Sequence, residues 1–346
     1  MTRHTRYFMA GSGAIMAAGL AAGLFAYYGG GFAALSASTG PDELNYVPAD
    51  AAVIAYADVG AIMNSDLRNR IRQAVPSQPT GQEEFQRQTG IDIERDIQYV
   101  VAAVTPGSTG SGLLVARGNF NPTQLESFAV EQGGAVEHYR EKRLISRSAI
   151  AEGHDGTLAF LEPGLVAIGD TRTVKRAIDA QMSASSVRSN DELMTLVAQM
   201  ERGNNAWAVG RFDVLSSHAN LPQQLTRQLP PVKWFAAAGH INGGVAGVLR
   251  VEATDEAAAD LLRRQVSGAM AFGEMMGRSD PRISAALSSV QMSGSGRTVQ
   301  LSFEVPAELL ELLIPKQVGF SVERADLPPV PPAPPAPPVP PAPATP

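Results

Sequence analysis

The chain has 346 residues, of which 44% are hydrophobic and 18% charged, so it can build the buried cores of two ordinary domains. Its formal net charge is −6, and no run of lysine and arginine interleaves with aromatic residues, which excludes a surface that follows nucleic-acid phosphates. The absence of cysteine excludes disulfides, thiolate zinc sites, a cysteine nucleophile and lipidation at an N-terminal cysteine.

The N-terminus has the pattern of a membrane segment. After Arg3 and Arg6, no Asp, Glu, Lys or Arg occurs until Asp42. Residues 7–28 are long enough to cross a bilayer as a helix, which takes roughly 17–25 apolar residues. Basic flanks stay in the cytoplasm. We therefore expect residues 1–6 in the cytoplasm, residues 7–28 as a signal anchor in the lipid bilayer of a bacterial inner membrane, and the body outside the cytoplasm.

Two further hypotheses concern this segment. Ala34, Leu35 and Ser36 offer small residues at the spacing that a signal peptidase requires, so the alternative is cleavage and secretion to the periplasm. The length of the apolar stretch, which exceeds a usual signal-peptide core, favours retention. Gly19 and Gly23 form a GxxxG pattern, which predicts a homodimer through close packing of two such helices.

After a linker over residues 29–44, strand-like and helical stretches alternate. Strands are predicted over residues 52–59, 97–104 and 113–120, with a helix from Ser65 between the first two. Asn121 and Pro122 suit the N-cap and first position of a helix that stops at Gly133. A hairpin over residues 156–170 and a helix over residues 173–181 follow.

The second part of the body repeats this order. Strands are predicted over residues 206–214, 232–239 and 246–254, with a helix from Leu221 and another that Thr254 caps. A hairpin over residues 288–305 and a helix that opens at Pro306 complete it. The third position of the second strand is aromatic in both parts, as Tyr99 and Trp234. Self-similarity of this kind indicates duplication.

The predicted fold class is α+β. It consists of two tandem repeats of an antiparallel sheet covered by helices, each a two-layer sandwich, preceded by one transmembrane helix. The first repeat covers residues 45–182 and the second residues 191–326, with a linker over residues 183–190. Residues 327–346 form a proline-rich tail that cannot enter a helix or sheet interior and is expected to be disordered or extended. The tail is either a spacer, a ligand for a proline-binding groove, or solvated chain without a partner.

Few residues indicate chemistry. None of the five histidines has metal-ligand spacing. Glu152, His154 and Asp155 lie together, but flanking glycines favour an exposed turn over an acid–base site. Asp58 and Asp213 follow the first strand of each repeat and are better explained as helix caps than as twin catalytic acids. The sequence therefore predicts no catalytic, cofactor-binding or metal-binding residue.

Two further patterns have a structural explanation. Glycines in residues 106–112 resemble a phosphate loop, but a strand follows them instead of a helix, so a hairpin turn is expected. Trp207 and Trp234 both lie in strands of the second repeat. They are interpreted as core residues, and the alternative is an aromatic groove for a carbohydrate or peptide.

The stretch YVPADAAVIAYADV, residues 46–59, follows the apolar segment and opens a duplicated body. In this it resembles uncharacterised bacterial envelope proteins with one membrane anchor, over residues 45–313. The resemblance implies membrane attachment and an extracytoplasmic body, and it brings no catalytic residues. We expect a non-enzymatic binding or scaffold protein whose repeats bind an envelope protein or cell-wall ligand, with no nucleic-acid partner. The alternative is an envelope hydrolase that uses carboxylates, or His154 with an acid.

Overall fold

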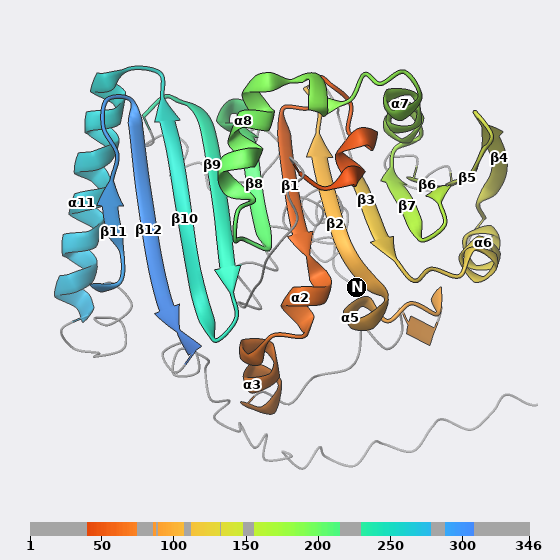
Figure 1. The fold of residues 1–346 in the computed structure, drawn as a ribbon, viewed down its shortest axis with the longest axis horizontal. Coiled ribbons are helices and arrows are strands. Elements are labelled where there is room, and N and C mark those ends of the chain that lie inside the picture. The colour runs from red at the N-terminus through yellow and green to blue at the C-terminus, as the bar shows by residue number, and fades with distance from the viewer. Residues whose placement is uncertain are drawn as a thin grey trace, which may run out of the picture. The chain divides into compact units, whose positions relative to one another are not determined.

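The described strands form one antiparallel sheet. The computed structural model describes residues 40–74, 86–87, 89–106, 112–131, 133–147, 156–214, 230–277 and 288–307. Its sheet has twelve strands in the order β11-β12-β10-β9-β8-β1-β2-β3-β7-β6-β5-β4 (Figure 1). These elements all lie within residues 40–307.

The strands have these bounds: β1 Val53–Asp58, β2 Ile97–Val104, β3 Leu113–Gly118, β4 Ala135–Tyr139, β5 Lys142–Arg147, β6 Gly156–Glu162, β7 Leu165–Gly169, β8 Ala206–Arg211, β9 Val232–Ile241, β10 Gly244–Ala253, β11 Gln291–Ser293 and β12 Thr298–Pro306. The helices are η1 Asp42–Tyr46, α2 Val59–Met63, α3 Asp66–Ala74, α5 Ile93–Asp96, α6 Pro122–Glu131, α7 Thr171–Met182, η2 Val187–Ser189, α8 Asp191–Met200 and α11 Glu256–Gly277.

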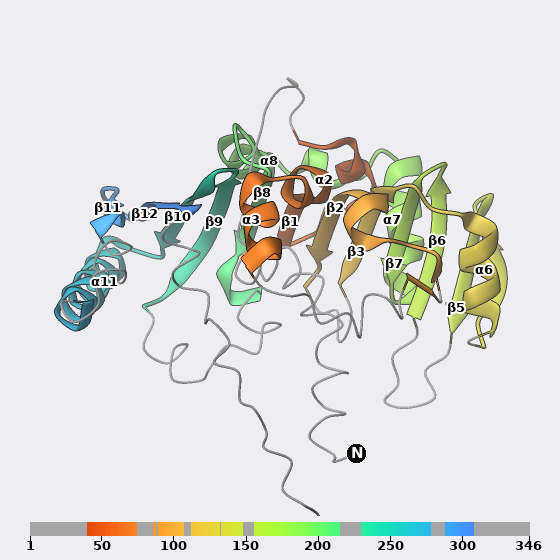
Figure 2. The same cartoon turned by 90° about the horizontal axis from the view of Figure 1, so that it is seen from below.

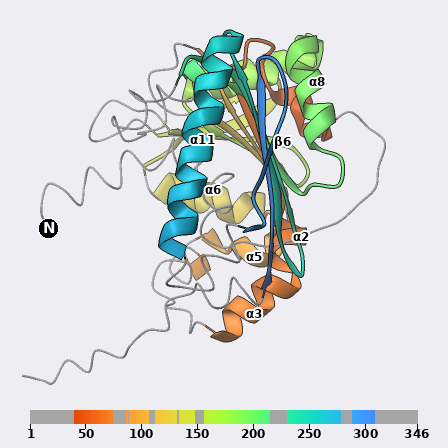
Figure 3. The same cartoon turned by 90° about the vertical axis from the view of Figure 1, so that its left-hand side faces the viewer.

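Helices lie on both faces of the sheet. The main core forms where η1, α7, η2 and α8 pack on one face, which we call the core face, and it includes Ile54, Val101, Ile178, Val197 and Trp207. On the opposite face α6 packs against β5, and α11 packs against β10 and β12. Figure 3 shows α11 and α6 on one side of the sheet and α8 on the other. Central strands are therefore apolar on both faces, as their sequences suggest.

The sequence predicted two separate sheets, and the structure joins their strands into one. Strand β1 pairs antiparallel with β8, with Ala55 opposite Ala208. The pairing removes two free edges, because each of these strands would otherwise end its own sheet. The predicted linker at 183–190 is part of the packed structure, since it contains η2 with Val187 fully buried, and Val187 N donates to Val47 O at 2.8 Å.

Most predicted elements of the described chain are present, with two local differences. The hairpin of β4 and β5 was not predicted, because its turn uses Arg140 and Glu141 at positive φ, 49° and 64°, in place of glycine. The cap of α11 is Asp255, whose Oδ1 accepts from Ala258 N at 2.8 Å, and not the predicted Thr254. Asn121 caps α6 as predicted, accepting from Thr123 N at 3.1 Å.

Several predicted segments lie outside the described residues. These are the candidate anchor at 7–28 with Gly19 and Gly23, the helix from Leu221, most of the helix from Pro306, and the tail at 327–346. Within the described chain, no helix combines the length and apolar character that crossing a bilayer requires.

Candidate functional site

A row of polar side chains crosses the core face at the end of β1, beside the start of β8. Asp58 at the end of β1 lies opposite Tyr99 of β2. Asp58 N donates to Asn205 O at 2.7 Å, and Asn205 N donates to Gly239 O at 3.2 Å, which places Asn205 between β1 and β9. His240 follows on β9. We call Tyr99, Asp58, Asn205 and His240 the polar row.

Aromatic rings form the next tier of the same face. Tyr56 stacks on Tyr99 with ring centroids 6.0 Å apart and on Trp207 with centroids 5.6 Å apart. Trp207 is buried and belongs to the main core. Asp58 lies two residues beyond Tyr56 on β1, and Asn205 lies two residues before Trp207 of β8, so each neighbours a stacked ring on the same face.

Burial governs the protonation of this site. Burial raises the pKa of Asp58, and a hydrogen bond from Ala61 N at 2.7 Å partly offsets that rise. Burial also raises the pKa of the Tyr56 phenol, and the negative charge of Asp58 adds to the rise. Loss of solvent lowers the pKa of His240 to about 4, so its ring is neutral at pH 7. Its Nδ1 contacts the carbonyl oxygen of Gly203.

Asn205 is the unusual member of the row. Its side chain is 6% exposed, yet within the described part of the chain neither its Oδ1 nor its Nδ2 has a hydrogen-bond partner. Buried amides are nearly always paired, because leaving water without a new partner costs roughly 1–3 kcal/mol. An amide that both donates and accepts is thus buried just before the first residue of β8 with its hydrogen-bonding capacity unused. This arrangement is suited to binding.

The first described residues are fastened beside this site. Gly40 N donates to Glu201 Oε2 at 2.5 Å, and Arg188 donates to Pro41 O at 2.9 Å. The buried Glu43 pairs with Arg117, whose guanidinium also lies 3.8 Å from Glu162. The pairing with Glu43 raises the pKa of Arg117. The chain that follows the apolar N-terminal segment therefore enters the body at a fixed point on the core face.

The structure separates the two acids that the sequence compared. Strands β1 and β8 are neighbours that run in opposite directions, so their C-terminal ends point away from each other. Asp58, at the end of β1, is therefore separated from Asp213, just after β8, by the length of the strands. Asp58 caps α2, as predicted. Asp213 is exposed and pairs with Arg211, which lowers the pKa of its carboxyl. They form no joint site.

Other sequence candidates are placed as follows. Trp207 and Trp234 are 3% and 7% exposed, which confirms that they are core residues. Glu152, His154 and Asp155 lie outside the described residues. Asn205 was not predicted from the sequence, because Gly203-Asn204-Asn205 is typical of a turn. In the structure Asn205 extends the backbone hydrogen bonding of β8 by one residue toward β1 and β9. Among the described residues, no three acidic or histidine side chains lie close enough together to hold a metal ion.

Comparisons with known proteins give few matches. No family model matches the chain, and no curated protein matches it. Among solved structures, crystal form I of TP0453 matches with a TM-score of 0.42 and 12% sequence identity, covering 81% of this chain and 98% of that one.

Proposed function

We propose that this chain is a membrane-tethered, extracytoplasmic binding protein of the bacterial envelope that performs no catalysis. Residues 7–28 serve as the tether, and the sheet carries the binding surfaces. The observation that carries the proposal is the fixed entry of the chain at Gly40 to Glu43, directly after an uncharged stretch of membrane-spanning length.

The proposal includes duplication of the body. The strand order β1-β2-β3-β7-β6 in the first part corresponds to β8-β9-β10-β12-β11 in the second. If the body is duplicated, its two-fold axis passes between β1 and β8, at the pairing of Ala55 with Ala208. Under this symmetry Tyr99 corresponds to Trp234, the pair of aromatics that the sequence aligned. Two fused copies would present related surfaces to a ligand with repeated units.

The polar row supports binding over catalysis. One oxygen of Asp58 is used to cap α2, and the neutral His240 ring is directed to a backbone carbonyl. Neither is arranged as an acid–base pair with a nucleophile. The open hydrogen-bonding capacity belongs to an amide, Asn205, which suits recognition of a polar group.

The first experiment measures intact mass and fractionation of the native protein. We expect a full-length mass in the detergent-extracted membrane fraction, and protease protection of residues 1–6 but not of the body in sealed spheroplasts. A mass that lacks residues up to about Ser36, recovered in the soluble envelope fraction, would overturn the tether and leave a secreted binding protein.

A variant separates anchoring from folding. Replacing Leu20 and Leu24 with arginine puts two charges into the proposed span without touching the described body. We expect loss of membrane association with the thermal unfolding of the body unchanged. A matched change at Gly29 and Gly30, outside residues 7–28, should leave membrane association intact.

A further inference from the structure

Strand β4 is the outermost strand at one end of the described sheet. It pairs with β5 on its inner side, and within the described chain no strand lies beyond its outer side (Figure 1). Figure 2 shows β5 and α6 at this end of the sheet and α11 at the other. The opposite edge strand, β11, has only three residues, whereas β4 has five. An edge strand offers unpaired backbone N–H and C=O groups to a further strand.

The turn of the β4–β5 hairpin determines which backbone groups of β4 point outward. Both turn residues, 140–141, have positive φ, as in the type I′ turn that joins two strands through two residues. A turn of this kind is closed by a hydrogen bond between its flanking residues, so Tyr139 and Lys142 form a hydrogen-bonded pair. Hydrogen-bonded and non-hydrogen-bonded pairs alternate along an antiparallel ladder. The N–H and C=O groups of Val136 and His138 therefore point away from β5.

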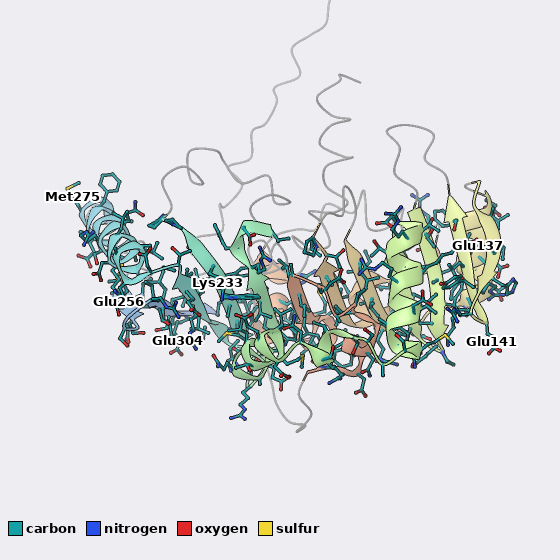
Figure 4. All side chains as sticks on the ribbon, turned by 90° about the horizontal axis from the view of Figure 1, so that it is seen from above. Glu137, Glu141, Lys233, Glu256, Met275 and Glu304 are labelled. Carbon is teal, nitrogen blue, oxygen red and sulfur yellow. The ribbon has the colours of Figure 1, made fainter. Side chains whose placement is uncertain are left out.

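Strand β4 lacks the features that usually protect a sheet edge. Its pairing with β5 is regular, without a bulge, and it contains neither proline nor lysine. Its one carboxylate, Glu137, lies at the outer end of the sheet (Figure 4), and its Oε1 is 3.1 Å from Nζ of Lys175 on α7. The Tyr139 hydroxyl donates to Asp179 of the same helix at 2.8 Å. Helix α7 therefore holds β4 in place and balances the charge that would repel a second strand.

The pattern of outward groups on β4 is complementary to itself. If two β4 strands pair antiparallel about a two-fold axis at Glu137, Val136 of each copy lies opposite His138 of the other. All four outward groups of a strand, an N–H and a C=O on each of these two residues, then have partners. A shift of the register by two residues loses this match. It places one of them opposite Gly134, whose N–H already donates to α6, or opposite Arg140 in the turn.

Side chains on both faces fit this register. On the core face Ala135 lies opposite Tyr139 of the second copy, a small residue against a large one, and each Glu137 keeps Lys175 as its counter-charge. On the other face Val136, which is 41% exposed, is a diagonal neighbour of its own copy. We propose that the protein forms a dimer through β4, in which two copies of the sheet join edge to edge. A two-fold contact is closed, so assembly through β4 ends at two copies.

Cysteine cross-linking of the full-length protein in detergent tests the dimer and its register. The chain has no cysteine, so each single-cysteine variant reports one position. In the proposed register Glu137 faces its own copy in a non-hydrogen-bonded pair, with Cα atoms about 4.5 Å apart, within disulfide range. Val136 and His138 lie roughly 7–8 Å from their own copies, beyond that range. Under the same mild oxidation, Glu137→Cys should form disulfide-linked dimers about tenfold faster than Val136→Cys or His138→Cys, measured by non-reducing electrophoresis.

Val136→Pro in the Glu137→Cys background tests the backbone pairing. It removes an N–H that points outward, a position where an edge strand tolerates proline, so thermal unfolding should change little. The rate of cross-linking should fall about tenfold, because the pairing loses a hydrogen bond and proline crowds the second strand. Val136→Ala in the same background is the matched control. It shortens the same side chain but keeps the N–H, and it should retain most of the rate.

Three results would overturn the proposal. Equal rates at the three cysteine positions would show that random collision, or pairing of residues 7–28 through Gly19 and Gly23, brings the chains together without a fixed register. Fastest cross-linking at position 136 or 138 would contradict the two-fold axis at Glu137. A rate that Val136→Pro and Val136→Ala change equally would exclude backbone pairing. If Val136→Pro unfolds the protein, the comparison of the three positions still decides. None of these measurements depends on whether the chain is tethered to a membrane.

Discussion

At the scale of single residues, the polar row contains buried groups that lower the stability of the fold and can form hydrogen bonds to a ligand. Asn205 is buried without a partner among the described residues, and Asp58 is buried enough to raise its pKa. Stable folds rarely keep such groups unless they serve a purpose, because each one opposes folding. Removing them should therefore stabilise the free protein, which is the reverse of the usual effect of a core substitution.

Asn205→Leu should raise the free energy of unfolding by about 1–2 kcal/mol, because an unpaired buried amide is replaced by an apolar side chain of similar size. Urea denaturation measures the change. Asn204→Leu is the neighbouring control: Asn204 Nδ2 donates to Met200 O at 2.7 Å, so its loss should lower stability. A decrease for Asn205→Leu equal to that of the control would show that the Asn205 amide is satisfied in solution.

Asp58→Asn should stabilise the protein in a pH-dependent way. The raised pKa means that the folded state binds the Asp58 proton more tightly than the unfolded state does. Wild-type stability therefore falls as pH rises from the unfolded pKa of about 3.9 through the raised pKa. Asparagine keeps the helix cap and removes this titration. The stability advantage of Asp58→Asn should be near zero at about pH 3.5 and constant once pH exceeds the raised pKa.

The opposite sign is expected for Asp213→Asn. Arg211 lowers the pKa of Asp213, so its contribution to stability is present above about pH 3.9 and is lost as pH falls through the lowered value. The variant should be slightly less stable than wild type at pH 7, since the pair is exposed. Parallel pH profiles for the two variants would contradict the assignment of both shifts.

At the scale of elements, regular patterns were predictable and exceptions in turns were not. Short apolar runs that recur in both halves predicted β1, β2, β3, β9 and β10, and the caps at Asp58 and Asn121 followed from residue type. The hairpin of β4 and β5 escaped because its strands are mostly polar and its turn lacks glycine. Strand β4 of this hairpin is the edge strand on the side of the sheet away from α11. Figure 4 shows Glu137 and Glu141 on that side and Met275 of α11 on the opposite side.

That hairpin turn should be improvable. Glu141 has φ of 64°, a conformation that costs an L residue roughly 1 kcal/mol and glycine almost nothing. Glu141→Gly should therefore raise the free energy of unfolding by about 1 kcal/mol. Glu141→Ala removes the same side chain but keeps the penalty, so it should give no such gain. Equal effects of the two substitutions would mean that the carboxylate, and not the backbone conformation, determines stability at this position.

At the scale of the whole described body, the joining of two predicted sheets depends on β1 and β8. Each half of the sequence looked complete, because pairing between halves leaves no local signal when both edge strands are already apolar. Ala55, Ala208 and their neighbours could face either a partner strand or a core helix. Only the three-dimensional arrangement shows that Ala55 lies opposite Ala208 and that Trp207 stacks on Tyr56 across the junction. The polar row was hidden for the same reason, since its members come from both halves.

Unfolding should therefore be a single transition. Trp207 and Trp234 are the only tryptophans and both lie in the second half, so tryptophan fluorescence reports on that half while far-ultraviolet circular dichroism reports on the whole. If β1 and β8 couple the halves, both signals should change at the same urea concentration. Arg211→Pro removes the backbone donor whose hydrogen bond to Ala52 O, at 2.8 Å, joins β8 to β1, and it should shift both midpoints together, with a loss of about 3 kcal/mol or more. Separate midpoints would show instead that the halves unfold independently, as two predicted sandwiches would, and that the β1–β8 pairing contributes little to the stability of the body.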